Sequence, residues 1–153
     1  MSMEKENSEV SNNKISTGLI ISNENFKKNP MLPAEIKEVI TNTLYYLLIF
    51  ISREDVIKIS CFPSKTNNIK KVLIKLKEFS PELVKGISSV LKELNLSKDI
   101  LHTTGLCYEM ENCYYETYLV GDDLMPIEQV KEKFMAIPKV INVDVEDIPI
   151  SQN

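Results

Sequence analysis

The chain has 153 residues, 43% of them hydrophobic, and a formal net charge of −4. This length fits one domain, or one small domain with an elaborated N-terminal part. The acidic balance argues against a general nucleic-acid binder, whose surface would be basic, and no apolar run reaches the ~18 residues that a membrane helix needs. Because the amino terminus lacks the hydrophobic core of a signal peptide, we expect a cytoplasmic protein with neither nucleic acid nor membrane among its partners.

The first part of the chain is expected to contain a tail and a small extension. Residues 1–14 are rich in Glu, Ser and Asn and have little to bury, so they are predicted to be a disordered tail. Residues 15–22 have the composition of a short strand, and residues 23–32 that of a loop with a turn at Asn29-Pro30. Residues 15–68 as a whole are predicted to form a strand-helix-strand extension.

Pro33 opens a segment that has two interpretations. Ile36 and Val39 begin an apolar stripe at helical spacing, whereas residues 44–51 are apolar on every side. Either the helix continues and ends fully buried, or residues 44–51 form a strand that turns back through residues 52–55. We predict the helix because the stripe starts well before Leu44. Residues 56–62 alternate between two faces and are predicted to be a strand.

The remaining residues, 69–153, are predicted to form the main domain. Their pattern indicates the order strand, helix, strand, strand, helix, strand, over residues 70–79, 80–96, a hairpin within 99–123, 126–137 and 139–148. The strands alternate between apolar and polar residues and the helices carry one apolar stripe each. A sheet with one apolar face, covered on that face by both helices, is the two-layer α+β solution for such a string.

Two local signals support these boundaries. Ser80 lies where an N-cap belongs, Pro81 takes the first helical position and Glu82 the first turn, where a carboxylate favours the positive helix end. On the preceding strand, Lys71, Lys75 and Lys77 share one face, which we expect to be solvated.

At this point the residues resemble a family. The segments VLIKLKEFSPELVKGISSVLKELNL and IEQVKEKFMAIPKVINVDVEDI, on either side of the tyrosine-rich hairpin, are similar to an ACT domain, the ferredoxin-like regulatory module. The resemblance covers roughly the last half of the chain, and the helix, the proline and the following INVDVED are its most characteristic part. It implies a two-layer ferredoxin-like (ACT-like) βαββαβ sandwich, preceded here by the β-α-β extension.

The resemblance also implies a function. ACT domains dimerise or associate sheet to sheet, often bind an amino acid at an interface, and regulate an enzyme or transcription factor without doing chemistry. We therefore expect a non-catalytic regulatory protein, a homodimer or a partner of another protein, that senses a small metabolite. The ligand would lie at the loop between the first strand and the first helix, at Glu78, Ser80, Pro81 and Glu82.

A departure from the family pattern supports an alternative function. Amino-acid-binding ACT domains usually carry a glycine in that loop, whereas this loop has none, and a carboxylate ligand would be repelled by Glu78 or Glu82. The alternative is an assembly subunit with no small-molecule ligand, which binds another protein through its tyrosine-rich sheet face. Tyrosine suits an interface because it combines an apolar body with a polar tip. The interface candidates are Tyr108, Tyr115 and Tyr118, with ordinary cross-strand packing as the competing interpretation.

No catalytic group, metal site or cofactor is predicted. His102, the chain's single histidine, has no Ser or Cys partner nearby in sequence. Asp122 and Asp123 are more typical of caps and loop charges than of a cation site. The three cysteines, Cys61, Cys107 and Cys113, lack metal-ligand spacing and are predicted to be free thiols.

Overall fold

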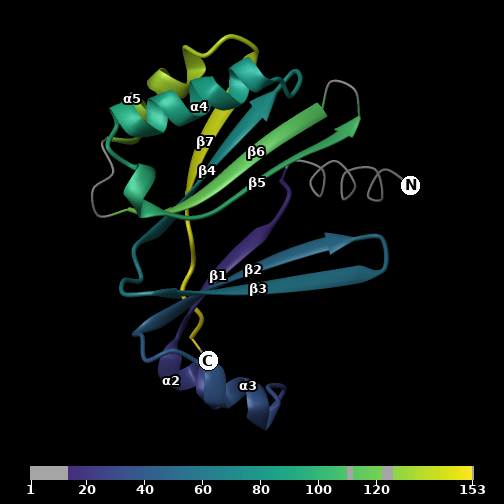
Figure 1. Ribbon diagram of the computed structural model, residues 1–153, viewed down its shortest axis with the longest axis vertical. Helices are drawn as coiled ribbons and strands as arrows, with labels where there is room; N and C mark the ends of the chain where they lie inside the picture. The colour runs from purple at the N-terminus through teal and green to yellow at the C-terminus, as the bar shows by residue number, and fades with distance from the viewer. Residues whose placement is uncertain (1–13, 110–111, 122–125, 153) are drawn as a thin grey trace. The chain divides into compact units, whose positions relative to one another are not determined.

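The computed structural model describes residues 14–109, 112–121 and 126–152 of the chain. Within them the chain is a mixed α+β protein with a three-stranded and a four-stranded antiparallel sheet and four α-helices (Figure 1). Two compact units contain these sheets. The N-terminal unit holds Ser16–Asn68 together with the final segment from Ile148, and the C-terminal unit holds Ile69–Asp147 with Lys14 and Ile15. The predicted tail, residues 1–14, lies outside the described residues except for Lys14.

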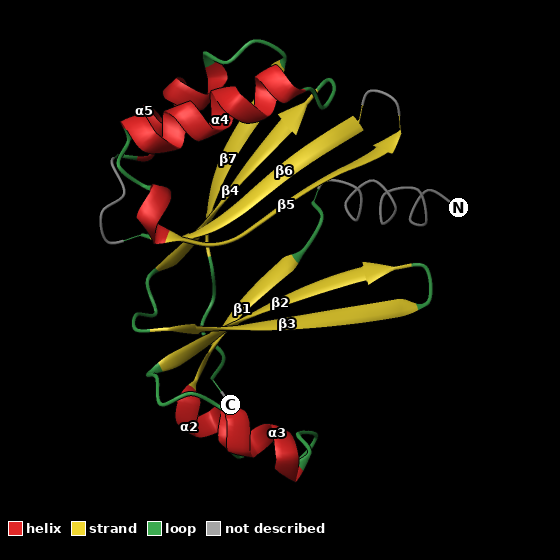
Figure 2. Cartoon of the chain, in the orientation of Figure 1, coloured by secondary structure: helices red, strands yellow, loops and turns green. Residues whose placement is uncertain are grey.

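The N-terminal unit is built on one sheet in the order β1-β2-β3. Its elements are β1 (Thr17–Ser22), α2 (Asn23–Lys27), α3 (Ala34–Val39), β2 (Tyr45–Arg53) and β3 (Val56–Ser64). Strands and helices are distinguished in Figure 2. On one face of the sheet, α2 packs Phe26 against Ile21, Tyr46 and Leu48. The sheet therefore has a small core of its own under α2.

The predicted long helix is wrong beyond Val39. α3 ends there, and the apolar run becomes β2, the central strand, with Leu47 and Ile49 at most 1% exposed. A run that is apolar on every side suits a strand buried on both faces as well as it suits a buried helix, and the β-branched and aromatic residues favour the strand. The strand turns back through Glu54 and Asp55, which agrees with the second interpretation of this segment, a strand that turns back through residues 52–55.

Residues 23–27 correct a second prediction. They form α2 where a loop is expected, because Ser22 caps the helix by accepting a hydrogen bond from the Asn25 N–H at 3.2 Å and Phe26 is buried. A five-residue helix is too short to leave a periodic apolar stripe in the sequence. The extension is therefore strand, two short helices and two strands, in place of strand, helix and strand.

The final segment of the chain returns to the N-terminal unit. Ile20 donates its N–H to the carbonyl of Pro149 at 2.9 Å, and Ser151 donates to the carbonyl of Ile20 at 2.7 Å. Ile150 thereby forms a parallel bridge with Ile20. The outer edge of β1 is thus partly covered by the chain itself.

The C-terminal unit has its sheet in the order β5-β6-β4-β7. Its elements are β4 (Ile69–Leu76), α4 (Pro81–Glu93), a 3-10 turn η1 (Ser97–Asp99), β5 (Ile100–Glu109), β6 (Asn112–Val120), α5 (Ile127–Met135) and β7 (Val140–Asp147). Each strand runs antiparallel to its neighbours in the sheet. Both helices lie on one face of the sheet (Figure 1), where Ile87 of α4 and Phe134 of α5 share a core with Val72 and Ile74.

Helix α4 starts and packs for reasons visible in its residues. The Ser80 hydroxyl accepts a hydrogen bond from the Leu83 N–H at 3.2 Å, which confirms the predicted N-cap. A Cβ atom on Gly86 would lie 3.2 Å from Cγ2 of Ile137, so the glycine allows α4 to approach the Ile137 side chain, just after α5, closely. No helix in the described part of the chain is long and apolar enough to cross a membrane.

Candidate functional site

The loop between β4 and α4 carries the residues predicted to bind a ligand, and Glu78 and Ser80 have partners inside their own unit. The Glu78 carboxylate forms an ion pair with the Lys139 ammonium. Ser80 caps α4 and Pro81 begins it. Glu82 lies in the first turn of α4, where its charge favours the helix end. These contacts explain the loop residues without a ligand.

Phe79, in the same loop, covers a glycine on a different strand. A Cβ atom on Gly105 of β5 would lie 2.5 Å from Cζ of Phe79, closer than real Cβ contacts come. Gly105 therefore makes room for the phenyl ring on the helix-covered face of the sheet. The close approach that an ACT ligand makes to a loop glycine has no counterpart here, because this glycine lies on β5 and is covered by a side chain.

The predicted interface tyrosines do not share one face. In the register of β4 with β6, Tyr115 lies opposite Ile74 on the helix-covered face and packs against the core. Burial raises its pKa, and a hydrogen bond with Thr103 lowers it by less. Tyr118 lies on the other face, opposite Lys71, and is 1% exposed. Tyr108 is 38% exposed, and its hydroxyl donates to the Lys14 carbonyl at 3.1 Å. Of the predicted tyrosines, Tyr108 is the most exposed, Tyr115 is partly buried and Tyr118 is buried.

A buried ion pair lies on the face of the four-stranded sheet opposite the helices. The Lys71 ammonium is 3.5 Å from Glu116 Oε1, and both side chains are at most 1% exposed. Glu116 Oε2 accepts a hydrogen bond from the Ile15 N–H at 2.6 Å. The ammonium also lies 3.8 Å from Glu146 and 5.4 Å from the centre of the Tyr118 ring. The prediction of a solvated lysine face is therefore wrong at Lys71.

Burial and the neighbouring carboxylates have opposite effects on the pKa of Lys71. Burial lowers the pKa of the ammonium, and the carboxylates of Glu116 and Glu146 offset part of that effect by raising it. Such a pair is expensive to bury and expensive to break. The Lys71–Glu116 pair is therefore interpreted as part of the fold and not as a binding site, because both charges already have partners within the protein.

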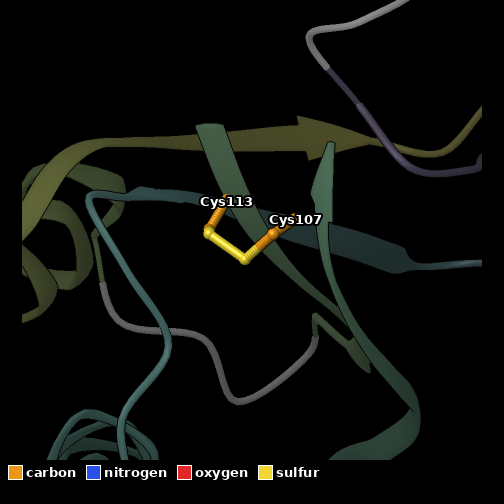
Figure 3. Close-up of a disulfide and its surroundings, with 2 residues drawn as sticks. All are labelled: Cys107 and Cys113. Carbon is orange, nitrogen blue, oxygen red and sulfur yellow. A yellow bond between two sulfur atoms is a disulfide. The ribbon is translucent and has the colours of Figure 1, made fainter. Parts of the chain in front are cut away.

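Two of the three cysteines form a disulfide. Cys107 of β5 and Cys113 of β6 lie directly opposite each other in the hairpin, with their Cα atoms 4.0 Å apart, and their sulfur atoms are bonded (Figure 3). The prediction of free thiols is wrong for these two residues, because hairpin pairing brings together cysteines that sequence spacing alone does not mark as partners. It is correct for Cys61, which is free and exposed.

Strand β3 presents an exposed apolar edge. Its neighbour on one side is β2, and no other described strand pairs with its second side. Val56, Ile57 and Ile59 are between 56% and 68% exposed. Helix α2 packs over β1 and β2, where its apolar side chain meets Ile21 and Tyr46. A long, exposed apolar edge of this kind is what folded proteins normally protect with charge, proline or a covering segment.

The register shows which backbone groups β3 offers. Glu54 and Asp55 form a two-residue turn, so Arg53 and Val56 close the hairpin as a hydrogen-bonded pair, and bonding alternates from there. Consequently the N–H and C=O groups of Ile57, Ile59 and Cys61 point away from β2. Pro63 continues this series, and a proline in a sheet belongs where its missing N–H would face solvent. Among the described residues, no backbone hydrogen bond outside β2 reaches these groups.

An open hollow of about 540 Å³ lies at the end of the same strand. It is lined by the connection from Thr41 to Leu44 and by Pro63, Ser64 and Lys65. Its polar groups are largely engaged, since the Thr41 N–H donates to Tyr46 at 2.7 Å and the Thr43 hydroxyl donates to the Ser64 carbonyl at 2.8 Å. Leu44 and Pro63 give it an apolar rim that remains accessible.

Sequence reasoning predicts the strand at 56–62 but misses its position at an edge. One signal is present, because Pro63 within the strand marks an edge. Ile57, Ile59 and Cys61 make one face apolar, whereas Lys58 and Ser60 lie on the other face with Val56 and Phe62. This alternation predicts a strand but does not distinguish a central strand from an edge strand.

Metal binding finds no support in the described residues, where no group of three His, Cys, Asp or Glu side chains could hold an ion. Asp122 and Asp123 lie outside the described residues. His102 of β5 is half-buried opposite Tyr118. No protein-family model and no curated protein matches this chain.

Proposed function

We propose that this protein is a non-catalytic interaction module that binds another protein by adding a strand to β3. The single observation that carries this proposal is the open apolar edge, with outward N–H and C=O groups at Ile57, Ile59 and Cys61. Strand addition uses such groups for affinity and the alternate side chains for specificity. The sequence analysis offers an assembly subunit as its alternative function, with the tyrosine-rich face as the interface. The proposal keeps that function and assigns the interface to β3 of the other sheet.

The C-terminal unit is proposed to be a ferredoxin-like, ACT-like domain. The element order from β4 to β7 and the sheet order β5-β6-β4-β7 support this, because they place the first and third strands side by side in the centre. Both helices on one face are a further point of agreement.

Sensing of a small metabolite by this unit is the second candidate, and the same strand order favours it. Against it stand the internal partners of Glu78 and Ser80 and the ring of Phe79 over Gly105. A thermal-shift screen with amino acids and nucleotides separates the two functions. A ligand at 100 times its dissociation constant adds about 2.7 kcal/mol of stability, whereas the interaction module shows no shift with any of them.

The main proposal is tested by photo-crosslinking at two exposed positions of the N-terminal unit. A benzoyl-phenylalanine replaces Ile59 on β3 or Val39 on α3, which are 56% and 72% exposed. In the cells that make the protein, position 59 is expected to give a defined protein adduct that disappears when Ile57→Lys is added, since an edge lysine blocks strand pairing. Position 39 is the matched control. Equal adducts at both positions, or none at 59, contradict the proposal.

A further inference from the structure

We infer that the strand added to β3 is β3 of a second copy of this chain, so that two N-terminal units form one continuous six-stranded antiparallel sheet. The inference rests on the proposed function and names its partner. Two observations make a second copy the best occupant: the charges that flank the edge, Asp55 before it and Lys65 after it, are complementary when two copies run antiparallel, and one end of the edge meets the hollow beside Pro63.

The register follows from charge. Two copies of one strand related by a two-fold axis pair each residue with a residue of equal but opposite offset from the axis. Lys58 is the charged residue within β3, and an axis at this position would place two lysines directly opposite each other. An axis at Ile59 would leave Asp55, in the turn before β3, beside the uncharged Pro63 of the second copy. An axis at Ser60 brings Asp55 near Lys65, the residue after β3, at both ends of the pairing. Since like charges opposite each other destabilise a strand pair and unlike charges stabilise it, charge favours the axis at Ser60.

The same register suits the backbone. Ile59 and Cys61 of the two copies face each other with their outward groups and can exchange N–H···O=C bonds in both directions. Ile57 pairs with Pro63, whose carbonyl accepts from Ile57 and whose missing N–H leaves one position without a donor. This missing hydrogen bond lies at the two ends of the pairing, so the hydrogen bonds between Ile59 and Cys61 in the middle are uninterrupted.

The side chains gain contacts on both faces. Ile57 of the second copy comes beside Pro63 at the rim of the hollow, where Leu44, itself 67% exposed, offers apolar surface. Ile59 meets Cys61 across the new boundary. On the other face Ser60 meets Ser60 at the axis, and this small polar pair permits close approach of the strands. The contact thereby covers part of the apolar surface of Ile57, Ile59 and Leu44.

Disulfide trapping tests the register. In a Cys61→Ser background, Ser60→Cys places two thiols opposite each other at the axis, in a pair that makes no hydrogen bonds with the other copy and has Cα atoms ~4.5 Å apart, which is within disulfide range. With oxidised glutathione as the electron acceptor, Ser60→Cys is expected to give a covalent dimer. Lys58→Cys and Phe62→Cys, on the same face of the same strand, are matched controls expected to stay monomeric on denaturing gels.

Association without a covalent bond is measured by analytical ultracentrifugation of the full chain over a range of concentrations. Wild type is expected to show reversible dimerisation. Ile59→Lys should raise the dissociation constant about tenfold or more, which corresponds to roughly 1.4 kcal/mol of lost interaction, while Val39→Lys leaves it unchanged. Circular dichroism verifies that each variant is folded, and both substituted residues are exposed in the single chain.

The outcomes separate the two proposals. A monomer at every concentration, with no trapping by Ser60→Cys and a crosslinked adduct at position 59 to a different protein, overturns the second copy as the occupant and leaves strand addition standing. Equal trapping at Lys58 or Phe62 overturns the register. A monomer with no adduct of any kind at position 59 overturns both.

Discussion

Neighbouring lysines on β4 show how position decides the worth of a charge. Lys70 forms its ion pair with Asp147, whose side chain is 79% exposed. Lys71, the next residue, points to the opposite face and is buried with Glu116. Exposed ion pairs contribute between 0 and about 1 kcal/mol, whereas breaking a buried pair costs about 3–5 kcal/mol because a charge stays behind without its counter-ion.

Lys71→Met is therefore expected to lower the free energy of unfolding by about 3–5 kcal/mol, since the Glu116 carboxylate remains buried. Urea denaturation measures this change. Lys70→Met is the matched control and should change the free energy by about 1 kcal/mol at most. The double variant Lys71→Met, Glu116→Leu removes both charges and is expected to regain most of the loss. A small effect of Lys71→Met would show that the pair is hydrated in solution.

The same lysine predicts a pH dependence. Because burial lowers the pKa of Lys71 in the folded chain below its ordinary 10.5, the unfolded chain binds more protons in the interval between the two values. Stability contributed by this group therefore rises as pH increases through the folded pKa toward 10.5. Unfolding free energies of wild type and the double variant, measured from pH 7 to about pH 10, should diverge in favour of wild type. Convergence of the two curves contradicts the lowered pKa.

At the scale of elements, the hairpin of β5 and β6 combines two kinds of constraint. Strand pairing already places Cys107 opposite Cys113, and the disulfide closes a loop with a sequence separation of 6. Chain-entropy arguments assign about 2 kcal/mol to a loop this short. The bond therefore secures the register of a hairpin that other contacts also define, including Tyr114 beside Tyr108.

Cys107→Ser with Cys113→Ser is expected to lower the free energy of unfolding by about 2 kcal/mol and to keep the fold. A reductant should lower the stability of wild type by a similar amount and leave the double variant unchanged. Cys61→Ser is the control, because this thiol is outside the bridge. Titration with a thiol reagent should count one thiol per native chain and three after reduction and unfolding. Three reactive thiols in the untreated protein would contradict the bridge.

Elements differ in how well the sequence predicts them, and the reason is local. The order of β4, α4, β5, β6, α5 and β7 is predictable from local signals. Ser80 and Pro81 mark the start of a helix, and the strands alternate between apolar and polar residues. β2 is not, because a run apolar on every side carries no period, and only burial on both faces of a sheet decides it. α2 is missed because its single turn depends on the Ser22 cap and on Phe26 finding the sheet.

Candidate sites follow the same division. The N-cap role of Ser80 is encoded by its neighbours, so the sequence predicts it, and that role also accounts for Ser80 without a ligand. The open edge at β3 depends on which strands pair, and pairing between distant residues leaves no mark in a single sequence beyond Pro63. The buried pair of Lys71 and Glu116 joins residues 45 positions apart in the chain, and each looks like an ordinary polar residue of a strand.

On the scale of the whole molecule, the two edges of the three-stranded sheet are treated differently. The outer side of β1 receives the returning segment near Ile150, while the outer side of β3 stays open within the described chain. A protein that protects one edge and leaves the other open has restricted where strand addition can happen. The segment that closes β1 follows β7 directly, so the N-terminal unit is complete only after the entire C-terminal unit has been made.

Removal of residues 149–153 is accordingly expected to expose the edge of β1 and to weaken the N-terminal unit selectively. The Ile20 amide, which donates to the Pro149 carbonyl, should lose hydrogen-exchange protection, whereas amides of the central strand β4 keep theirs. Ser151→Pro removes the single N–H that bonds to the Ile20 carbonyl and should give a milder form of the same effect, and Gln152→Pro, at an exposed position, is its control. Equal loss of protection in β1 and β4 would mean that the segment stabilises the chain globally, and the selective role of the returning segment would have to be abandoned.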